Sequence, residues 1–299
     1  MRTAASLIVT APLAALKGRT AALAGASAGM YGETLCNYGV LMVKRLSNGG
    51  SFDGALVFPG GVHEPEDLGF ADSHGACAVR ETFEETGLLL TTGGAAHAGA
   101  LSFGEICSGH GIAPLSVQPL ARWTTPRAQK KRFDTRFVML NVGDGDGWLL
   151  DQLGRERVQA SELSSLDWIA PDQAMRANRT ELPLFPPQAY ILHELSTVRR
   201  WQDLAQSMAA RFVGAEGSME PLLCRRSDSK VVALFPGDYA YPDMRVNEHS
   251  PQLRVSDGDL FCREPHAPGL HRMEMDSAAK GGFLAANLIR TVASGLSRL

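Results

Sequence analysis

The spacing of apolar and polar positions predicts short strands and one well-marked helix in the first 180 residues. Apolar and β-branched runs bounded by turn residues favour strands. The predicted strands cover residues 5–10, 38–45, 55–58, 101–106 and 136–142, and a further strand is expected to start at 88–90. Residues 73–86 are expected to form a helix, with Ser73 as its N-cap and Gly87 just past its end.

The pattern changes after Pro171. Residues 172–177 suggest a short helix, 183–187 a break, and 188–212 a long helix with apolar residues at helical spacing. A boundary is therefore expected near residue 180. It divides residues 1–180 from a C-terminal α/β extension, residues 181–299, which would either cover a site or form a homodimer contact.

Composition describes an ordinary globular chain and excludes several classes of partner. Of the 299 residues, 44% are hydrophobic and 20% are charged, and the net charge is −3. Because a nucleic acid polymer needs a basic face, any nucleotide bound here is expected to be a small ligand. No apolar run approaches the roughly 18 residues that span a membrane. The five cysteines form no CxxC pair, which argues against a zinc site or a disulfide framework.

The helix at 73–86 carries the sharpest chemical signal. Glu81, Glu84 and Glu85 stand at helical spacing, so that their carboxylates share one face. Like charges at that spacing repel one another, and a hard cation such as Mg²⁺ would compensate them and also bind phosphate oxygens. An acidic face that is merely solvated is the alternative.

The residues around these carboxylates resemble the signature of the Nudix hydrolase family. Arg80, Glu81, Glu84, Glu85, Gly87 and Leu88 match its second half in order, and Gly61 matches its start. Asp67 stands where the family has Glu, and Thr82 stands where an apolar residue is usual. Twelve residues separate Asp67 from Arg80 instead of seven, so the box at 61–88 is enlarged by five, and the role of Asp67 stays open.

The resemblance implies a fold and a set of roles. The fold would be α/β (α+β), with a mixed sheet sandwiched between helices in residues 1–180. Glu81, Glu84 and Glu85 would hold Mg²⁺ or Mn²⁺, and one of them, of which Glu84 is our candidate, would act as the base for the attacking water. Arg80 would orient the carboxylates by charge-assisted hydrogen bonds. Gly60 and Gly61 would let the backbone approach the phosphates.

Other residues indicate which pyrophosphate is cut. Arg45, Gly54 and residues 58–61 match a pattern of coenzyme A-cleaving Nudix enzymes, although Leu46 and Gly50 depart from it. Residues 123–126, 131–137, 167–169 and 234–238 resemble the peroxisomal coenzyme A diphosphatase branch with an enlarged box. This resemblance implies hydrolysis of coenzyme A or acyl-coenzyme A to 3′,5′-ADP and (acyl-)4′-phosphopantetheine. The alternatives are a Nudix hydrolase of ADP-ribose, NADH or dinucleoside polyphosphates, and a Nudix-fold binding module without catalysis.

Three polar features leave two readings each. Arg132 and Arg136 fall on one face of a predicted strand, where they would bind substrate phosphate or lie on a solvated surface. His63 and His74 flank the enlarged loop and would contact substrate or solvent. Gly25-Ala26-Ser27-Ala28-Gly29 matches a serine-hydrolase elbow, but a loop rich in alanine and glycine explains it better.

The chain ends bear on localisation. Ser297-Arg298-Leu299 is a conservative variant of a peroxisomal address, which predicts a peroxisomal protein if the source is a eukaryote and a cytoplasmic one if it is a bacterium. The first 32 residues contain no acid, as in a mitochondrial transit peptide, but the apolar run at 5–10 favours a buried strand instead.

Overall fold

The structure is a computed structural model in which most of the chain is described. The described residues are 1–16, 34–46, 55–92, 102–110, 113–143, 147–150, 152, 163–178, 184–212, 217–228, 230–241, 269–277, 283–292 and 295–298. The elbow candidate at 25–29 lies outside these residues, as do Gly50, Gly54 and Cys262. Among the described helices, none has the length and apolar character needed to cross a membrane.

A mixed sheet forms the centre of the first 180 residues. Its strands are β1 (Arg2–Pro12), β2 (Tyr38–Arg45), β3 (Leu56–Val57), β4 (Gly60–Val62), β5 (Gln118–Thr124), β6 (Phe133–Asn141) and β7 (Leu163–Ile169). The order is β3-β2-β1-β6-β5, while β4 pairs with β1 and β7 with β2. The pair β1–β6 is parallel and the pairs on either side are antiparallel. The apolar run at 5–10 is therefore a central strand, as the sequence predicts.

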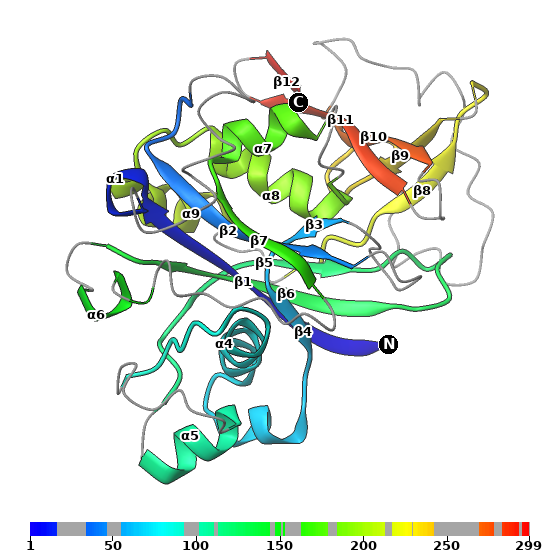
Figure 1. Cartoon of the computed structure of the whole chain (residues 1–299). Coiled ribbons are helices and arrows are strands. Elements are labelled where there is room, and N and C mark those ends of the chain that lie inside the picture. The colour runs from blue at the N-terminus through cyan, green and yellow to red at the C-terminus, as the bar shows by residue number, and fades with distance from the viewer. Residues whose placement is uncertain are drawn as a thin grey trace.

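Helices cover both faces of this sheet, which confirms the predicted sandwich. Successive residues of a strand point to opposite faces: Leu7 and Val9 pack in one apolar cluster with α4 (Ser73–Thr86) and α5 (Phe103–His110), whereas Ile8 packs in the other. That second cluster contains α7 (Pro171–Ala177), α8 (Pro186–Ser196) and α9 (Leu204–Phe212). Figure 1 shows α4 and α5 below the sheet, and α7 and α8 above it. The short elements α1 (Leu13–Leu16), η1 (Pro65–Gly69), α6 (Gly147–Leu150) and η2 (Trp201–Asp203) connect these layers.

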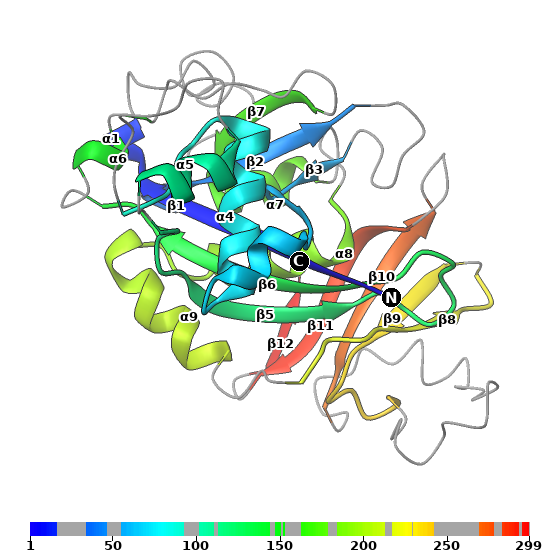
Figure 2. The same ribbon diagram turned by 90° about the horizontal axis from the view of Figure 1, so that it is seen from below.

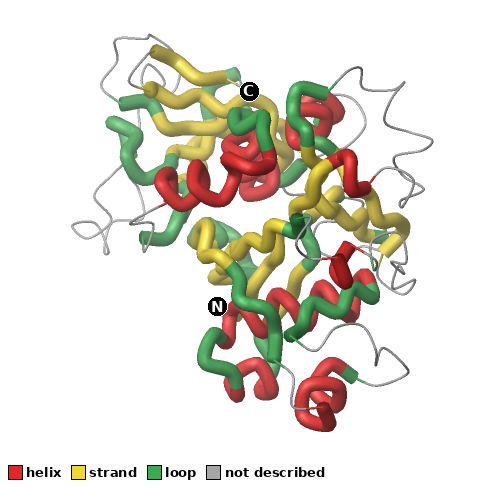
Figure 3. Tube along the Cα trace, turned by 90° about the vertical axis from the view of Figure 1, so that its left-hand side faces the viewer, coloured by secondary structure: helices red, strands yellow, loops and turns green. Residues whose placement is uncertain are grey.

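The C-terminal extension adds a second, antiparallel sheet. It runs β12-β11-β10-β9-β8, from β8 (Leu222–Arg225), β9 (Val231–Leu234), β10 (His271–Ser277), β11 (Phe283–Val292) and β12 (Gly295–Arg298). Figure 2 shows this sheet beside α8 and the ends of β5 and β6, and Figure 3 shows yellow strands gathered near the C-terminus with helices beside them. Trp123 of β5, Tyr190 of α8 and Phe235 meet with ring centroids 5.5–5.7 Å apart. The extension therefore shares a hydrophobic core with the first sheet.

Two of the segments that resemble the coenzyme A diphosphatase branch, 123–126 and 234–238, form this junction. Thr124 and Met219 are joined by a backbone hydrogen bond of 3.1 Å, and Met219 donates to the carbonyl of Arg122 at 2.8 Å. After β9 the chain turns at Gly237, whose φ is 92°, and Asp238 forms a buried ion pair with Arg272 at 2.6 Å. The segments 123–126 and 234–238 thus hold the extension in place.

Most predicted elements are confirmed at or near their bounds. The strand at 38–45 and the helix at 73–86 have the predicted ends, and Gly87 ends α4 with a φ of 75°. The predicted strands at 5–10, 55–58 and 136–142 correspond to β1, β3 and β6, and the short helix at 172–177 to α7.

Four predictions of local structure were wrong, each for an identifiable reason. Residues 101–106 contain the start of α5 because Ser102 and Glu105 form a capping box. Residues 88–90 form no strand, since the Gln152 side chain holds both backbone groups of Leu89. Asp72, not Ser73, caps α4, and accepts from the Gly75 N–H at 2.9 Å.

The fourth error concerns the long helix predicted over 188–212. It is divided into α8, η2 and α9. The chain turns between α8 and η2 because Asn37 binds there, donating to the Arg199 carbonyl at 2.9 Å and accepting from the Trp201 N–H at 2.7 Å. A partner from a distant segment ends the helix.

Candidate active site

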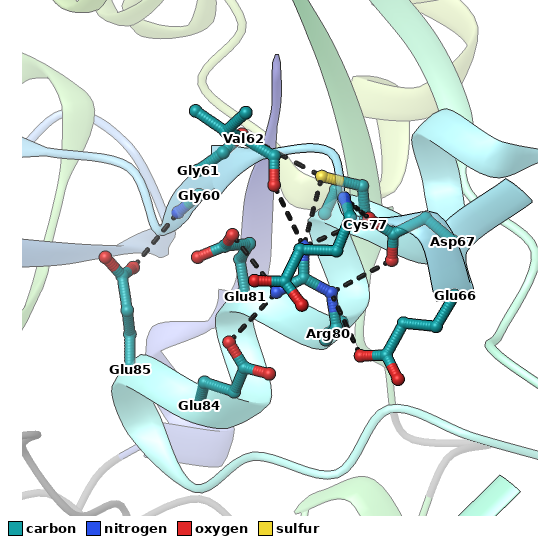
Figure 4. A network of polar contacts seen from close by, with 12 residues as sticks. Gly60, Gly61, Val62, Glu66, Asp67, Cys77, Arg80, Glu81, Glu84 and Glu85 are labelled. Carbon is teal, nitrogen blue, oxygen red and sulfur yellow. Dashed lines mark hydrogen bonds and ion pairs between the residues drawn. The ribbon is translucent and has the colours of Figure 1, made fainter. Parts of the chain in front are cut away.

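The site is built on one face of α4, where the helix lies against β4. Asp72 caps its first turn, and the left-handed Gly87 ends it directly after the carboxylates. Cys77 lies against the Gly61 carbonyl, and Glu81 lies against Gly61 one turn later. Helical spacing places Glu81 beside Gly61 and Glu85 beside Gly60, while Glu84 points to Arg80, as Figure 4 shows.

Arg80 is the centre of the network, and its guanidinium is buried. It pairs with both oxygens of Asp67 at 2.9 and 3.0 Å and donates to the Val62 carbonyl at 3.0 Å. Its Nη1 lies 3.1 Å from Glu81 Oε1 and 3.0 Å from Glu84 Oε2. Arg80 therefore fixes two of the three carboxylates, as the sequence leads one to expect (Figure 4).

Asp67 is the residue whose role the sequence leaves open. It is buried, and besides pairing with Arg80 it accepts the Glu64 N–H at 2.8 Å. Burial alone would raise the pKa of Asp67, but hydrogen bonds from Arg80 and Glu64 outweigh it and lower the pKa. Asp67 thus stays charged and orients Arg80. Its position in the signature, with five residues between Gly61 and Asp67, is the signal that identifies it.

Glu85 connects the helix to the glycine turn. Its Oε2 accepts the Gly60 N–H at 3.0 Å, and its Oε1 lies 3.5 Å from Nη2 of Arg45. The same Arg45 nitrogen lies 3.4 Å from the Gly60 carbonyl oxygen. The structure therefore brings Arg45 and Gly60 together with the carboxylate helix.

Positions 60 and 61 need glycine, because other parts of the chain lie too close to their backbone for a Cβ atom. A Cβ at Gly60 would collide with the backbone of Ala5 and Ser6, and a Cβ at Gly61 would collide with the Glu81 carboxylate. Side chains at either position would separate β4 from β1 or push Glu81 away from the backbone.

The carboxylates are poised to accept a cation. Burial raises the pKa of Glu81 to about 7, although Arg80 opposes the shift, and the nearby Glu84 adds to it. Burial also raises the pKa of Glu84, whose side chain is 40% exposed. Two negative groups held close in a partly dry site repel each other, and a cation would relieve that cost.

The donor set fits a hard divalent ion. Each of Glu81 and Glu84 gives one oxygen to Arg80, and their other oxygens, Oε2 and Oε1, bind no partner among the described residues. Carboxylate oxygens are the ligands that Mg²⁺ and Mn²⁺ prefer. In the described part of the chain, no three His, Cys, Asp or Glu side chains already surround a single point. A metal ion would therefore draw the free oxygens inward.

The two arginines predicted as a pair lie in different surroundings. Arg132 donates to the Thr125 carbonyl at 3.0 Å and to Glu220 at 2.7 Å, so it binds the extension. Arg136 lies on β6, on the face of Val138 that packs toward α4, and is close enough to His74 to lower its pKa. A substrate role for either arginine stays a prediction.

Comparison with known proteins identifies relatives along most of the chain, although no family model matches it. The nudix hydrolase 7 of Caenorhabditis elegans is 29% identical over 252 residues, covering 77% of this chain and 78% of the relative. The acyl-coenzyme A diphosphatase NUDT19 of Gallus gallus is 25% identical and covers 70% of this chain and 74% of its own length. A NUDIX hydrolase from Alicyclobacillus acidocaldarius has a similar fold, with a TM-score of 0.51, 24% identity, and coverage of 70% of this chain and 96% of that one.

Proposed function

Because the chain belongs to the Nudix hydrolase family, and so to the pyrophosphohydrolases, we propose that its substrate is coenzyme A or an acyl-coenzyme A. The products would be 3′,5′-ADP and (acyl-)4′-phosphopantetheine. The observation that carries the proposal is the α4 carboxylate face, held by Arg80 against the glycine turn.

Each side chain has a role that its contacts support. Glu81, Glu84 and Glu85 hold Mg²⁺ or Mn²⁺, which when bound polarises the bridging phosphate and activates a water molecule. Glu84 would accept the proton of the attacking water, because it is the most exposed of the three and burial raises its pKa. Glu85 is almost fully buried and bonded to Gly60, which suits a ligand better than a base.

Arg80 and the glycines prepare the site for the phosphates. Arg80 orients Glu81 and Glu84 and is itself oriented by Asp67. Gly60 and Gly61 let β4 pack directly against β1 and against the Glu81 carboxylate, and contact of their backbone with phosphate stays a prediction. Arg45 lies beside Gly60 and would bind an anionic oxygen. This positioning keeps the reacting groups in line before the chemical step.

The choice of coenzyme A is supported by residues outside the helix. Arg45 and the turn at 58–61 match the coenzyme A pattern, and a relative covering most of the chain is named as an acyl-coenzyme A diphosphatase. We assign catalysis to residues 1–180.

We also assign a peroxisomal location to the protein in a eukaryotic source, on the C-terminal address Ser297-Arg298-Leu299, of which Ser297 and Arg298 belong to β12.

The test is direct hydrolysis. Purified protein is incubated with Mg²⁺ and coenzyme A, and the products are resolved by mass. We expect 3′,5′-ADP, and a loss of roughly 10²–10⁴-fold in turnover on Glu84→Gln. Glu105→Gln, at an exposed position on α5, is the matched control and should leave turnover unchanged.

The other outcomes separate the alternatives. Cleavage of ADP-ribose or NADH with coenzyme A left intact would keep the hydrolase and overturn the substrate. No cleavage of any of them, or turnover unaffected by Glu84→Gln, would favour a binding module.

A further inference from the structure

A pocket that opens widely to solvent, with a lining more apolar than polar, lies at the other end of α4 from the carboxylates. It has a volume of about 580 Å³ and is lined by Arg2, Thr3, Val62, His63, Leu68, Ser73 and His74. These residues come from the start of β1, the end of β4 and the residue after it, η1, and the start of α4. In Figure 1 the N-terminus lies beside β4 at this point. The segment that enlarges the signature supplies three of the lining residues, Leu68, Ser73 and His74.

Two of the lining residues are histidines that contact each other. His63 Nε2 and His74 Nδ1 are 2.9 Å apart and share a hydrogen bond, with the rings at 71° and their centroids 4.7 Å apart. Since one nitrogen of each ring is used in this bond, the other nitrogen of each ring can donate or accept elsewhere. His63 is fixed by a bond from its backbone N–H to the Thr3 carbonyl at 3.1 Å.

The charge around the pocket favours an anion. Asp67 is neutralised by Arg80, and Asp134 by Arg122 at 2.6 Å. Arg2 lines the pocket and Arg136 lies beside His74, and neither guanidinium forms an ion pair within the described part of the chain. Asp72 is committed to capping α4. The residues that line the pocket thus include a cation, Arg2, and no carboxylate.

A transition metal on the histidine pair is the rival occupant. A metal ion would find two protein ligands, because no third His, Cys, Asp or Glu of the described residues completes a set. It would also lie near Arg2 and Arg136. Stable metal sites use three or four protein ligands, so the anion fits better.

We propose that this pocket binds a phosphate monoester, with Arg2, His63 and His74 as its polar ligands. Val62 and Leu68 provide an apolar wall, which suits a phosphate attached to an organic group. His63 lies two residues beyond Gly61, about 7 Å along the strand. The pocket is therefore close enough to receive the 3′-phosphate of coenzyme A, which the ribose separates from the pyrophosphate. This identification of the ligand rests on the proposed function.

Protonation of the histidines strengthens the pocket for a dianion. Burial lowers the pKa of both histidines. For His63, Arg80 lowers the pKa further, whereas Asp67 and Asp72 raise it. For His74, His63 and Arg136 lower the pKa further, whereas Asp72 and Asp134 raise it. Both rings are thus neutral in the empty pocket near pH 7. A bound dianion favours their charged forms, so its binding takes up protons.

The first experiment measures binding without turnover. The affinities of 3′,5′-ADP and 5′-AMP are compared by calorimetry on the full chain. We expect 3′,5′-ADP to bind at least roughly tenfold more tightly, and Arg2→Ala to remove that difference. Lys130→Ala is the matched control, because Lys130 is exposed on the β5–β6 hairpin, carries the same charge and does not line the pocket.

The second experiment tests the histidines with variants that keep the hydrogen bond. Gln at 63 and Asn at 74 imitate the nitrogens that the two rings share, but neither takes a charge. The double variant His63→Gln/His74→Asn should bind 3′,5′-ADP almost as well as the wild type at pH 8. It should lack the severalfold gain in affinity that the wild type shows at pH 6.5.

The outcomes separate this inference from the proposed function. An Arg2-dependent preference for 3′,5′-ADP in a protein that leaves coenzyme A intact would support the pocket and overturn the substrate. Inorganic phosphate that shifts the NMR signals of His63 and His74, with equal affinities for the two nucleotides, would support the phosphate pocket and overturn its link to the substrate. The absence of any such shift with phosphate or 3′,5′-ADP would overturn the pocket itself.

Discussion

Two networks of buried arginine stand at opposite ends of the molecule, and their charge balance differs. In the extension, the buried charges are equal in number: Arg272 pairs with Asp238 at 2.6 Å and Arg226 pairs with Glu274 at 2.7 Å, while the more exposed Asp228 is a second partner of Arg226 at 2.7 Å. In the α4 site, the single buried arginine, Arg80, faces four carboxylates, those of Glu66, Asp67, Glu81 and Glu84. A balanced network holds structure, whereas the surplus of negative charge around Arg80 is what a metal ion would complete.

The largest effect is expected from breaking the balanced network. Asp238→Asn removes the charged, bidentate partner of the buried Arg272, and we expect the free energy of unfolding to fall by about 3–5 kcal/mol. Turnover per folded molecule should stay the same, because the described residues of the α4 site all lie outside the extension. Urea unfolding and a coenzyme A assay on the same preparation measure both.

Asp203→Asn is the control for that change. Asp203 and its partner Arg200 are both well exposed, at 55% and 70%, so losing this pair should alter stability by about 0–1 kcal/mol. A drop of more than tenfold in the turnover of correctly folded Asp238→Asn would show that the extension acts on the site.

The second prediction concerns Asp67, the counterpart of Asp238. Asp67→Asn removes the bidentate partner of Arg80 but leaves Glu81 and Glu84 to balance its charge. Stability should therefore fall less than for Asp238→Asn, whereas turnover should fall roughly 10- to 100-fold because the carboxylates lose their orientation. Asp67→Glu, which restores the family's residue, should recover most of the turnover. If the turnover of Asp67→Asn equalled that of the wild type, the Asp67–Arg80 pair would serve only stability, like the Asp238–Arg272 pair.

A third prediction uses the surplus charge directly, in protein freed of metal by a chelator. Burial holds the pKa of Glu81 at about 7, above its ordinary value of 4.5. As the pH rises, Glu81 ionises in the unfolded chain before it ionises in the folded protein. The folded protein therefore loses stability progressively between pH 4.5 and pH 7, and the whole loss is present above pH 7. The stability of Glu81→Gln relative to the wild type should thus rise between pH 5 and pH 8, by about 1–3 kcal/mol.

Saturating Mg²⁺ should reverse that result. An ion bound by the wild type stabilises it by mass action, and Glu81→Gln should lose that gain. Thermal unfolding with and without Mg²⁺ measures it. Equal stabilisation of both proteins by Mg²⁺ would place the ion elsewhere.

The sequence predicts the α4 site well because its signals are local. Helical spacing places Glu81, Glu84 and Glu85 on one face, and Gly87 ends the helix, as the structure shows. The strand at 38–45 is predicted to the residue, since its apolar run is buried in the central sheet. These features depend on neighbours within a few positions.

What the sequence did not predict depends on distant partners. The Gln152 side chain keeps Leu89 out of a strand, and Asn37 ends α8. The alternation along the strand places Arg132 on the face expected for a phosphate ligand, but its guanidinium donates a hydrogen bond to Glu220 of the extension. The capping box of Ser102 and Glu105 is a local signal that could have identified α5.

The smallest expected effect comes from a matched pair of glycines, one in each region. Gly87, with a φ of 75°, ends α4, and Gly237, with a φ of 92°, forms the turn before Asp238. Alanine in a left-handed conformation costs about 1–2 kcal/mol, and a Cβ at Gly237 would meet only ordinary contact, 3.9 Å from His271 Nδ1. Both substitutions should therefore lower stability by a similar amount, while Gly217→Ala, where a Cβ meets open space, should change it by less than about 0.5 kcal/mol.

Only Gly87→Ala should also reduce turnover severalfold, because it disturbs the helix end that carries Glu84 and Glu85. Equal losses of turnover for Gly87→Ala and Gly237→Ala, measured well below the unfolding temperature of each variant, would mean that the balanced network in the extension also positions the catalytic helix.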